Sequence, residues 1–317
     1  MRQQKKKFTI EQQIRHMKEQ NIRFLLFTEK DAKDFLRTQN YYFKVKSFAK
    51  NYEKINNKYK DLDFAYLRKF SILDTLFRDL ILEISLLCEH ILRTDVCYIS
   101  SINGYDDGYG IVTRFLYQMQ EKYEQNGNSG KKLPKTLYLY DEGKAQIYSK
   151  DMLDKYRLDL PIWVFIEILS FGELIDFYKY YIEKYNIRKQ DTVDIFDLYT
   201  IKSIRNVAAH NNCILHTLTA PPLGQMELSV KLKNFLQSKK LLSRTKKEIR
   251  IPMIHDFLCL ILTYNKLCHS IKTRGIIKSK IEDFLNKCEK HPEYFCSNTL
   301  IKERYDFIKH SVIAILS

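Results

Sequence analysis

The sequence predicts an all-α protein. Its first 103 residues contain neither Gly nor Pro, and the whole chain of 317 residues has only nine Gly and six Pro. Because these two residues usually mark turns and end regular elements, their scarcity favours long helices. The most regular segment, residues 66–94, repeats apolar side chains at steps of three and four positions, which is the spacing of one helix face. No segment carries a convincing strand pattern, so we expect a helical bundle.

The individual helices can be followed in order along the chain. Thr9 with Gln12, and Thr28 with Asp31, have the spacing at which a hydroxyl caps a helix and a polar residue three positions on reaches back to the cap. The expected helices cover residues 10–21, 29–52, 66–94, 111–125, 162–169, 173–185, 191–216, 225–238, 252–269, 275–290 and 298–316.

The middle of the chain holds most of the turn signals. Pro161 is expected in the first turn of a helix, and Gly172 is expected to interrupt that helical segment or to allow a close helix contact. Trp163 and Phe171 are expected to be core aromatic residues. Loops are predicted over residues 103–110 (NGYDDGYG) and 126–135 (NGNSGKKLPK).

The net charge of +15, from 53 Lys and Arg against 38 Asp and Glu, is unevenly distributed. Residues 1–60 carry a net +10, residues 61–224 carry −4 and residues 225–317 carry +9. We therefore divide the chain into a basic N-terminal helical segment, a helical core and a basic C-terminal helical segment with these bounds. Such segregation favours a polyanion as partner, most commonly a nucleic acid. The alternative is a soluble basic protein with solvated Lys faces.

The cysteines and the N-terminus exclude several other classes. The seven Cys form no CxxC pair, so neither a zinc ribbon nor a disulfide framework is indicated, and reduced thiols predict a cytoplasmic protein. His255 and Cys259 are four residues apart and are expected to pack in the core rather than to bind a metal. The basic residues 1–10 precede a polar run rather than an apolar one, so no signal peptide is predicted, and no stretch suits a membrane span. We expect no metal and no cofactor.

The segment that carries candidate chemistry is residues 204–212 (IRNVAAHNN), on or at the end of a helix. At about 100° per residue, Asn206 and His210 share a helix face, whereas Arg205 lies roughly 140° from His210. One site can still use all three if Arg205 wraps round the helix, if the helix loosens near Ala209, or if a second subunit completes the geometry.

Arg, His and an amide are the groups that phosphodiester transesterification requires. A guanidinium can hold phosphate oxygens at two points and offset their developing charge. An imidazole can take or give a proton near neutral pH. The alternative is an Arg and a His on an ordinary helix, because this spacing also arises by chance.

The same segment resembles a known family signature. Residues 203–211 (SIRNVAAHN) are similar to the R-N-x-x-A-H signature of the Abi (abortive infection) family, whose AbiD/AbiF-like members belong to the HEPN (higher eukaryotes and prokaryotes nucleotide-binding) superfamily. One departure is visible, because Asn211 and Asn212 follow His210 where many relatives have Arg and then an aromatic residue. Further elements of the family are resembled in the family order by residues 8–14 (FTIEQQI), 40–42 (NYY), 88–94 (CEHILRT) and 161–172 (PIWVFIEILSFG).

This resemblance implies a HEPN-type helical bundle with additional N- and C-terminal helices. It further implies a metal-independent endoribonuclease in which the motifs of two subunits meet in one composite site, so a homodimer is expected. In that interpretation Arg205 clamps the phosphate and His210 acts as acid or base while the ribose 2′-hydroxyl attacks phosphorus, which leaves a 2′,3′-cyclic phosphate. Asn206 positions Arg205, His210 or the phosphate.

Three further residues are candidates for support of this site. Glu89 and Arg93 are four residues apart, in the order that favours an ion pair within one helix. Glu89 has the alternative role of orienting Arg205 across the bundle. Asn211, directly after the motif His210, is the third supporting candidate.

Two groups of residues are candidates for RNA binding. Tyr41, Tyr42, Lys44 and Lys46 interleave rings with cations, as proteins that bind single-stranded RNA do, although packing of the Tyr rings is an equal alternative. A second group lies in a basic run and is the best candidate for contact with the RNA backbone, with a solvated face as the alternative. Its members are Lys231, Lys233, Lys239, Lys240, Arg244, Lys246, Lys247 and Arg250.

The function that these patterns favour is a bacterial ribonuclease of the abortive-infection type, acting as a toxin or phage-defence effector. An unrestrained ribonuclease would kill its host, so we expect an antitoxin, and the basic ends suggest a small RNA in that role. The alternatives are a non-catalytic RNA-binding or scaffolding module, and a HEPN partner of a nucleotidyltransferase antitoxin.

Overall fold

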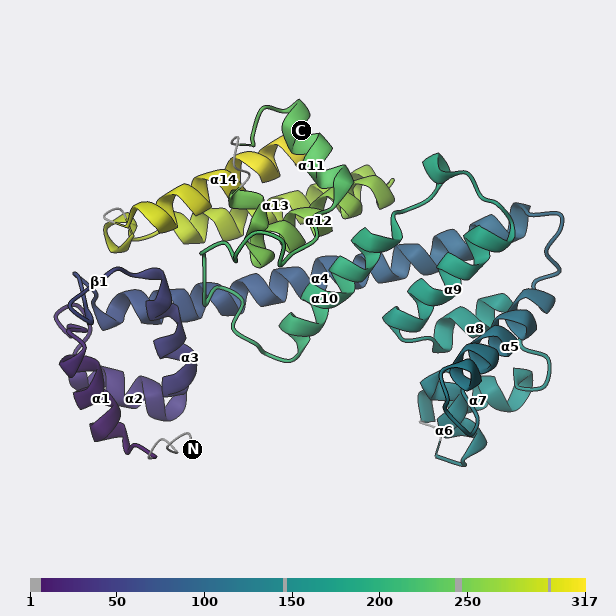
Figure 1. Cartoon of the computed structure of the whole chain (residues 1–317), viewed down its shortest axis with the longest axis horizontal. Coiled ribbons are helices and arrows are strands. Elements are labelled where there is room, and N and C mark those ends of the chain that lie inside the picture. Colours follow the sequence, from purple (N-terminus) through teal and green to yellow (C-terminus); the bar gives the residue numbers. More distant parts are fainter. Residues whose placement is uncertain (1–6, 145–146, 243–246, 296–297) are drawn as a thin grey trace. The chain divides into compact units, whose positions relative to one another are not determined.

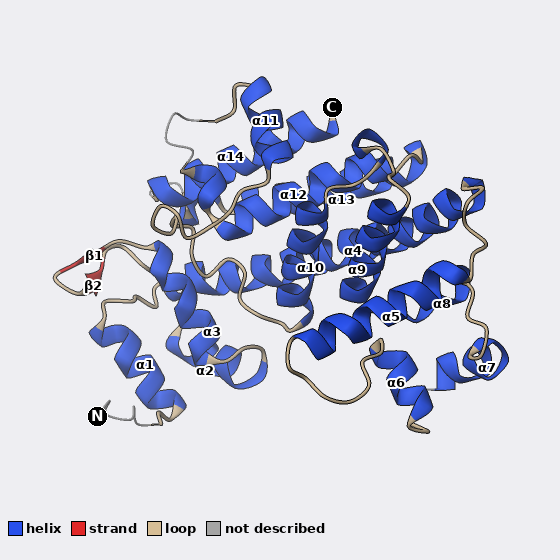
Figure 2. Cartoon of the chain, turned by 45° about the vertical axis from the view of Figure 1, so that its right-hand side comes forward, coloured by secondary structure: helices blue, strands red, loops and turns tan. Residues whose placement is uncertain are grey.

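The protein is all-α, as the sequence predicts (Figure 2). The computed structural model describes residues 7–144, 147–242, 247–295 and 298–317. The α-helices are α1 (Ile10–Glu19), α2 (Glu29–Thr38), α3 (Tyr42–Ser47), α4 (Phe64–Ile102), α5 (Gly110–Gln125), α6 (Lys135–Asp141), α7 (Ile147–Tyr156), α8 (Ile162–Ile168), α9 (Phe171–Lys184), α10 (Ile195–Ala209), α11 (Val230–Ser238), α12 (Pro252–Leu267), α13 (Ile271–Glu289) and α14 (Thr299–Leu316). Short 3-10 helices are η1 (Phe48–Asn51), η2 (Lys189–Asp191), η3 (Glu248–Arg250) and η4 (Pro292–Tyr294), and the two strands are β1 (Lys54–Ile55) and β2 (Lys58–Tyr59).

The chain forms two compact units. Unit 1 consists of Met1–Ile84, Ser203–Asn265 and Ser270–Ser317, and unit 2 consists of Ser85–Lys202 and Lys266–His269. The first part of α4 and the last part of α10 therefore belong to unit 1. Unit 1 contains nearly all of the two basic terminal segments together with the motif at residues 204–212, although these parts are far apart in the sequence.

In unit 1, helices α12, α13 and α14 lie along the first part of α4 (Figure 1). The Phe77 ring of α4 meets Phe257 of α12 edge-on at 4.7 Å between centroids and stacks on Phe284 of α13 at 5.2 Å. The Asn265 side chain of α12 donates to the Ile315 carbonyl of α14 at 2.9 Å. The part of the predicted apolar stripe that lies in unit 1 thus packs against these helices.

The first expected helix is confirmed, and the second is divided. Thr9 caps α1 in a reciprocal capping box with Gln12. The single helix expected over residues 29–52 is wrong, because the chain leaves the helix between α2 and α3. There the Asn40 side-chain oxygen accepts from the Tyr41 N–H at 2.9 Å, which offers the backbone an alternative to the helical bond.

A small hairpin also contradicts the expectation of no strands. Strands β1 and β2 pair antiparallel, Lys54 with Tyr59 and Ile55 with Lys58. The two turn residues, Asn56 and Asn57, have φ of 50° and 63°. Both conformations are left-handed, which Asn tolerates best after Gly, so the consecutive Asn pair is the sequence signal for this hairpin.

Unit 2 is built around an aromatic core. Helix α5 contacts α8 and α9, and Phe115, Phe165 and Phe177 from these three helices meet with centroids 5.1 to 5.9 Å apart. Helices α6 and α7, which were not predicted from the sequence, contact each other, and α7 also contacts α8. Phe171 is buried as expected, but Trp163 is 51% exposed, so its assignment to the core is wrong.

Gly172 does not interrupt the helical segment around it. The break lies at Leu169 and Ser170, where Ser170 caps α9 in a capping box with Glu173, and Gly172 lies inside α9. A Cβ at Gly172 would lie 2.6 Å from the Lys202 Nζ, so the glycine allows the close approach of that side chain. Of the two roles considered for Gly172, the structure therefore supports the close contact.

Over the described residues, the structure contains no helix with the length and apolarity that a membrane span requires.

Candidate active site

The motif residues lie at the C-terminal end of α10. Arg205 and Asn206 are within the helix, and His210 is the first residue after its last helical position. The Asn211 N–H donates to the Ala208 carbonyl and the Asn212 N–H to the Val207 carbonyl, both at 3.1 Å. With Asn211 at a φ of 56°, this is a Schellman motif that satisfies the last carbonyls of the helix.

Arg205 and His210 present different environments on this helix end. The Arg205 Nη1 donates to the Asn206 side-chain oxygen at 3.1 Å, so the amide contacts the guanidinium directly. The His210 N–H donates to the Asn206 carbonyl at 2.9 Å, which keeps the turn helical up to this residue. The helix therefore does not loosen near Ala209, and the reach of Arg205 or a second subunit remains as the way to bring both groups to one phosphate.

The His210 side chain is available to a ligand. The residue is exposed, and no side chain in the described parts of the chain has a hydrogen bond or ion pair with its ring in the structure. Arg205 and Asn206 are partly buried. The same helix end thus offers one accessible imidazole and a guanidinium that an amide contacts.

Asn211 is fixed by a lysine from a distant part of the chain. The Lys44 Nζ donates to the Asn211 carbonyl at 3.1 Å and to its side-chain oxygen at 3.0 Å. Lys44 is only 3% exposed. This burial contradicts the expectation that Lys44 contacts RNA and shows instead that it anchors the turn after His210.

Asp74 of α4 holds the segment that follows this turn. One of its oxygens accepts from the Ile214 N–H at 2.7 Å and from the Leu215 N–H at 2.9 Å. The other forms an ion pair with Arg78 and lies 3.9 Å from the Lys44 Nζ. Asp74 is fully buried, and a buried carboxylate is tolerated because it has these cations and N–H donors around it.

The charges of this cluster act on one another. Burial lowers the pKa of Lys44, the Arg78 guanidinium lowers it further, and Asp74 raises it. Burial and then Asp74 raise the pKa of the Cys213 thiol to about 11, and Ser47 lies within hydrogen-bond distance of its sulfur at 3.2 Å. Cys213 is therefore a protonated packing residue at neutral pH.

This cluster was not predicted from the sequence. Its signal is a charged pair, Asp74 and Arg78, four residues apart inside the most apolar stretch of helix in the first hundred residues. Charged residues are almost never fully buried unless they are paired, so their position on an apolar stripe could have indicated a buried ion pair. Its link to Lys44 and Asn211 could not be found, because those partners come from other segments.

The supporting residues Glu89 and Arg93 belong to unit 2. The Arg93 Nη2 lies 2.9 Å from the Glu89 Oε1, which is the expected pair within one helix. Arg93 also donates to the Ile166 carbonyl at 3.0 Å and to the Leu169 carbonyl at 2.9 Å, so it binds carbonyls at the end of α8. The role of Glu89 in orienting Arg205 involves residues of two units and stays a prediction.

The other residues of the expected aromatic and basic group differ in their exposure. Tyr41 is exposed, whereas Tyr42 is partly buried and its burial raises its pKa to about 12. The Lys46 Nζ donates to the Tyr59 hydroxyl at 3.1 Å and lies 4.6 Å from the centre of that ring. Phe43, which was not among the predicted residues, is 78% exposed beside them. Tyr41 and Phe43 are thus the rings of α3 and its cap that a base could stack on.

The basic run lies on α11 and η3 and between them. Arg244 and Lys246 fall outside the described residues. Lys231, Lys239, Lys240 and Lys247 are exposed, and Lys233 and Arg250 are partly buried. The exposed members are accessible to a phosphate backbone, and their RNA contact stays a prediction.

His255 and Cys259 pack in the core as expected. Both are buried, and the Cys259 Sγ lies 3.6 Å from the His255 Nε2. That nitrogen accepts from the Ser229 N–H at 2.9 Å, while Nδ1 faces Asp256 at 2.8 Å. Within the described ranges, no three His, Cys, Asp or Glu residues are grouped so that they could hold a metal ion.

Charge separates the two units sharply. Unit 1 carries 37 Lys and Arg against 20 Asp and Glu, a net +17, and unit 2 carries 16 against 18, a net −2. The motif at residues 204–212 belongs to unit 1. The sequence alone placed this motif in a near-neutral centre between two basic ends, whereas in the folded chain it shares a unit with nearly all of both.

Together, the fold and this site define an all-α protein with a basic unit whose motif helix ends in an exposed histidine. Comparison with known proteins identifies the family to which it belongs. The sequence model described as Abi-like protein matches residues 34–216, which is more than half of the chain, so the protein belongs to the Abi-like family. No curated protein and no solved structure matches the chain.

Proposed function

We propose that this protein is an endoribonuclease of the abortive-infection type, with Arg205, Asn206 and His210 as its catalytic residues. The observation that carries the proposal is the end of α10, where an exposed imidazole follows a guanidinium held by an amide. Membership of the Abi-like family supports the role in abortive infection and phage defence.

The reaction is a transesterification within the RNA strand. The ribose 2′-oxygen forms a bond to the adjacent phosphorus while the bond from phosphorus to the 5′-oxygen breaks, which leaves a 2′,3′-cyclic phosphate and a 5′-hydroxyl. One imidazole takes the proton of the 2′-hydroxyl, and one gives a proton to the departing 5′-oxygen. Arg205 binds the non-bridging oxygens and offsets the charge that develops on them.

A homodimer supplies the second imidazole. One chain contains a single motif, and its Arg205 and His210 point to directions roughly 140° apart on a helix that stays regular to Ala209. Two copies of the helix end, facing each other, would place an Arg205 from one chain near a His210 from the other. The same pairing provides both the base and the acid of the reaction.

RNA is the proposed substrate and also the proposed inhibitor. The net charge of +17 on unit 1 supports binding of a polyanion to the same unit that holds the motif. A small RNA bound to this basic unit would restrain the enzyme by covering the site. RNA that co-purifies with the protein at moderate salt is the expected result, and its absence would count against this form of restraint.

A single-turnover cleavage assay tests the enzyme. We expect Arg205→Ala and His210→Ala each to slow cleavage of single-stranded RNA by about 10²- to 10⁴-fold. His310→Ala is the matched control, because His310 is an exposed histidine of α14 and is not part of the motif. The product should carry a 2′,3′-cyclic phosphate, detected by mass spectrometry.

The dimer has its own readout in the same assay. Addition of excess His210→Ala protein to wild type should lower activity below the wild-type level, because mixed dimers have only one imidazole.

If Arg205→Ala and His210→Ala cleave as fast as wild type, the site is wrong. If neither the wild type nor the variants cleave while all bind RNA equally, the protein is a non-catalytic RNA-binding module.

A further inference from the structure

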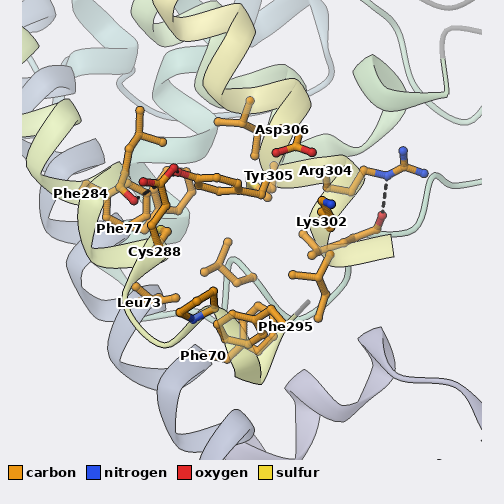
Figure 3. Close-up of a pocket in the computed structure, with 18 residues that line it drawn as sticks. Phe70, Leu73, Phe77, Phe284, Cys288, Phe295, Lys302, Arg304, Tyr305 and Asp306 are labelled. Carbon is orange, nitrogen blue, oxygen red and sulfur yellow. Dashed lines mark hydrogen bonds between the residues drawn. The ribbon is translucent and has the colours of Figure 1, made fainter. Parts of the chain in front are cut away.

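A cavity of about 380 Å³ lies within unit 1, and none of the motif residues 204–212 line it. Its walls come from α4, α12, α13, α14 and the segment that follows the motif turn (Figure 3). Its volume falls in the range of pockets that bind small molecules.

The interior of this cavity is apolar. Leu73 and Phe77 of α4, with Phe284 and Cys288 of α13, line the same side of it (Figure 3). Burial raises the pKa of the Cys288 thiol to about 12, so the sulfur stays protonated and uncharged at neutral pH. A molecule inside the cavity therefore meets phenyl rings, aliphatic side chains and a neutral thiol.

The charged residues that line the cavity do not select a ligand charge. Glu289 accepts from the Tyr305 hydroxyl at 2.8 Å and forms an ion pair with Lys309, so its charge is offset. Arg304 donates to the Leu218 carbonyl at 3.4 Å and lies 4.0 Å from Glu248. The other two charged lining residues, Lys302 and Asp306, have opposite sign and are one helix turn apart on α14.

We propose that this cavity is a binding site for an uncharged small molecule that consists mainly of hydrocarbon. Neutrality follows from the balanced charges, since a carboxylate or an ammonium group would meet a like charge as well as an opposite one. The apolar class follows from the lining, because burial of hydrocarbon against these rings is the main free energy that the cavity offers.

Occupancy of this site would act on the segment after the motif. Leu215 and Leu218 line the cavity, and two buried polar side chains bind their backbone groups. Asp74 accepts from the Leu215 N–H, while Asn51 donates to the Leu215 carbonyl at 3.0 Å and accepts from the Leu218 N–H at 2.8 Å. A ligand therefore adds contacts to the segment that directly follows the turn carrying His210, although the binding itself does not depend on ribonuclease activity.

The test uses full-length protein and two uncharged probes, the dye Nile red and decanol. Ile308→Trp and Met253→Trp fill the cavity from α14 and α12 respectively, because both side chains line it. Ile313→Trp is the matched control, since Ile313 lies on the same helix α14 but is 53% exposed and outside the cavity lining. We expect the two filling variants to bind Nile red about tenfold more weakly than wild type and the control to bind it equally well.

Decanol should displace the dye from wild type, and decanoate and decylammonium should each displace it less well. Amide hydrogen exchange on wild type gives a readout that needs no variant: decanol should slow exchange in peptides of α13 and α14 and leave α5 and α9 unchanged. Equal dye binding by folded filling variants, or unchanged exchange in α13 and α14, would overturn the proposal. Tighter binding of decanoate than decanol would overturn its claim of neutrality.

Discussion

Unit 1 and unit 2 differ in the continuity of their sequence and in their net charge. Unit 1 joins three stretches of sequence and carries a net +17, whereas unit 2 is almost entirely one continuous stretch and carries −2. The two basic ends of the chain are therefore gathered in one unit, which carries the excess charge of the protein. Since a phosphate backbone is attracted by clustered cations, binding of RNA should depend on unit 1 and be insensitive to unit 2.

The two units also differ in the polar groups that they bury. Unit 1 buries a cluster of charges in which Asp74 faces Lys44 and Arg78. Unit 2 buries the Glu89 carboxylate of the Glu89–Arg93 pair, and its aromatic core has polar contacts that include the Tyr181 hydroxyl, which donates to Asp106 at 2.8 Å. Removal of one member of the unit 1 cluster leaves uncompensated buried charge, so loss of Asp74 should cost more than loss of the Tyr181 hydroxyl.

Asp74→Ala is expected to give the largest effect. It leaves two buried cations without their carboxylate and removes the acceptor of the Ile214 and Leu215 N–H groups. We expect a loss of about 3–5 kcal/mol in the free energy of unfolding, measured by urea denaturation. Asp79→Ala, an exposed aspartate on the same helix α4, is the control and should change it by less than about 0.5 kcal/mol.

A small effect of Asp74→Ala would contradict the view that the cluster anchors unit 1. Hydrogen exchange adds a local readout in the same variant. Exchange should rise in the segment that follows α10, because two of its N–H groups no longer have an acceptor, and should stay unchanged in α5 and α9.

Tyr181→Phe is expected to give a moderate effect confined to unit 2. The ring packing remains, but Asp106 is left with one donor fewer and keeps the Ser100 hydroxyl at 2.7 Å. We expect a loss of about 2 kcal/mol in unfolding free energy and no change in RNA affinity. Tyr180→Phe is the control, because Tyr180 is only partly buried and contacts Phe115 through its ring. A change in RNA affinity with Tyr181→Phe would show that RNA binding does not depend on unit 1 alone.

Part of the fold could be predicted from the sequence. The class of fold and the caps at Thr9 and Thr28 were predictable, because they depend on local spacing and on the absence of Gly and Pro. The break at Asn40 was not predicted, since a side chain that competes for backbone bonds leaves the apolar pattern intact.

Some features of the candidate site could be predicted from the sequence and others could not. The position of Arg205, Asn206 and His210 at a helix end follows from sequence, and so does their joint use of one helix. The anchoring of the turn by Lys44 does not, because Lys44 and Asn211 are 167 residues apart and a lysine among exposed rings has the pattern of a surface residue. Burial of charge is decided by tertiary packing, which local spacing does not report.

A smaller effect is expected from the exposed lysines directly after α11. Lys239→Gln with Lys240→Gln should weaken binding of single-stranded RNA several-fold at low salt. The slope of log affinity against log salt should fall by about 0.7 for each phosphate that the variant no longer neutralises. Lys184→Gln with Lys189→Gln, two exposed lysines of unit 2, is the control and should leave the slope unchanged. Equal effects of the two pairs would show that the charge acts through the whole protein rather than through unit 1.

The smallest expected effect is a pH dependence at Lys46 in unit 1. Burial lowers the pKa of Lys46 from 10.5 to about 8, with a further lowering from Lys54. Below pH 8 the ammonium is charged in both the folded and the unfolded chain, and the cost of burying it is fully present. Between pH 8 and 10.5 the folded chain releases this proton first, so its free energy of unfolding should rise with pH.

Lys46→Met removes the titration. The unfolding free energy of the variant relative to wild type should therefore fall by about 1 kcal/mol between pH 7 and 9.5. This figure is reduced for solvent screening, because the group is partly exposed. Urea denaturation at the two pH values measures it, with the exposed Lys50→Met as control. A difference that stays constant with pH would show that Lys46 is charged throughout this range.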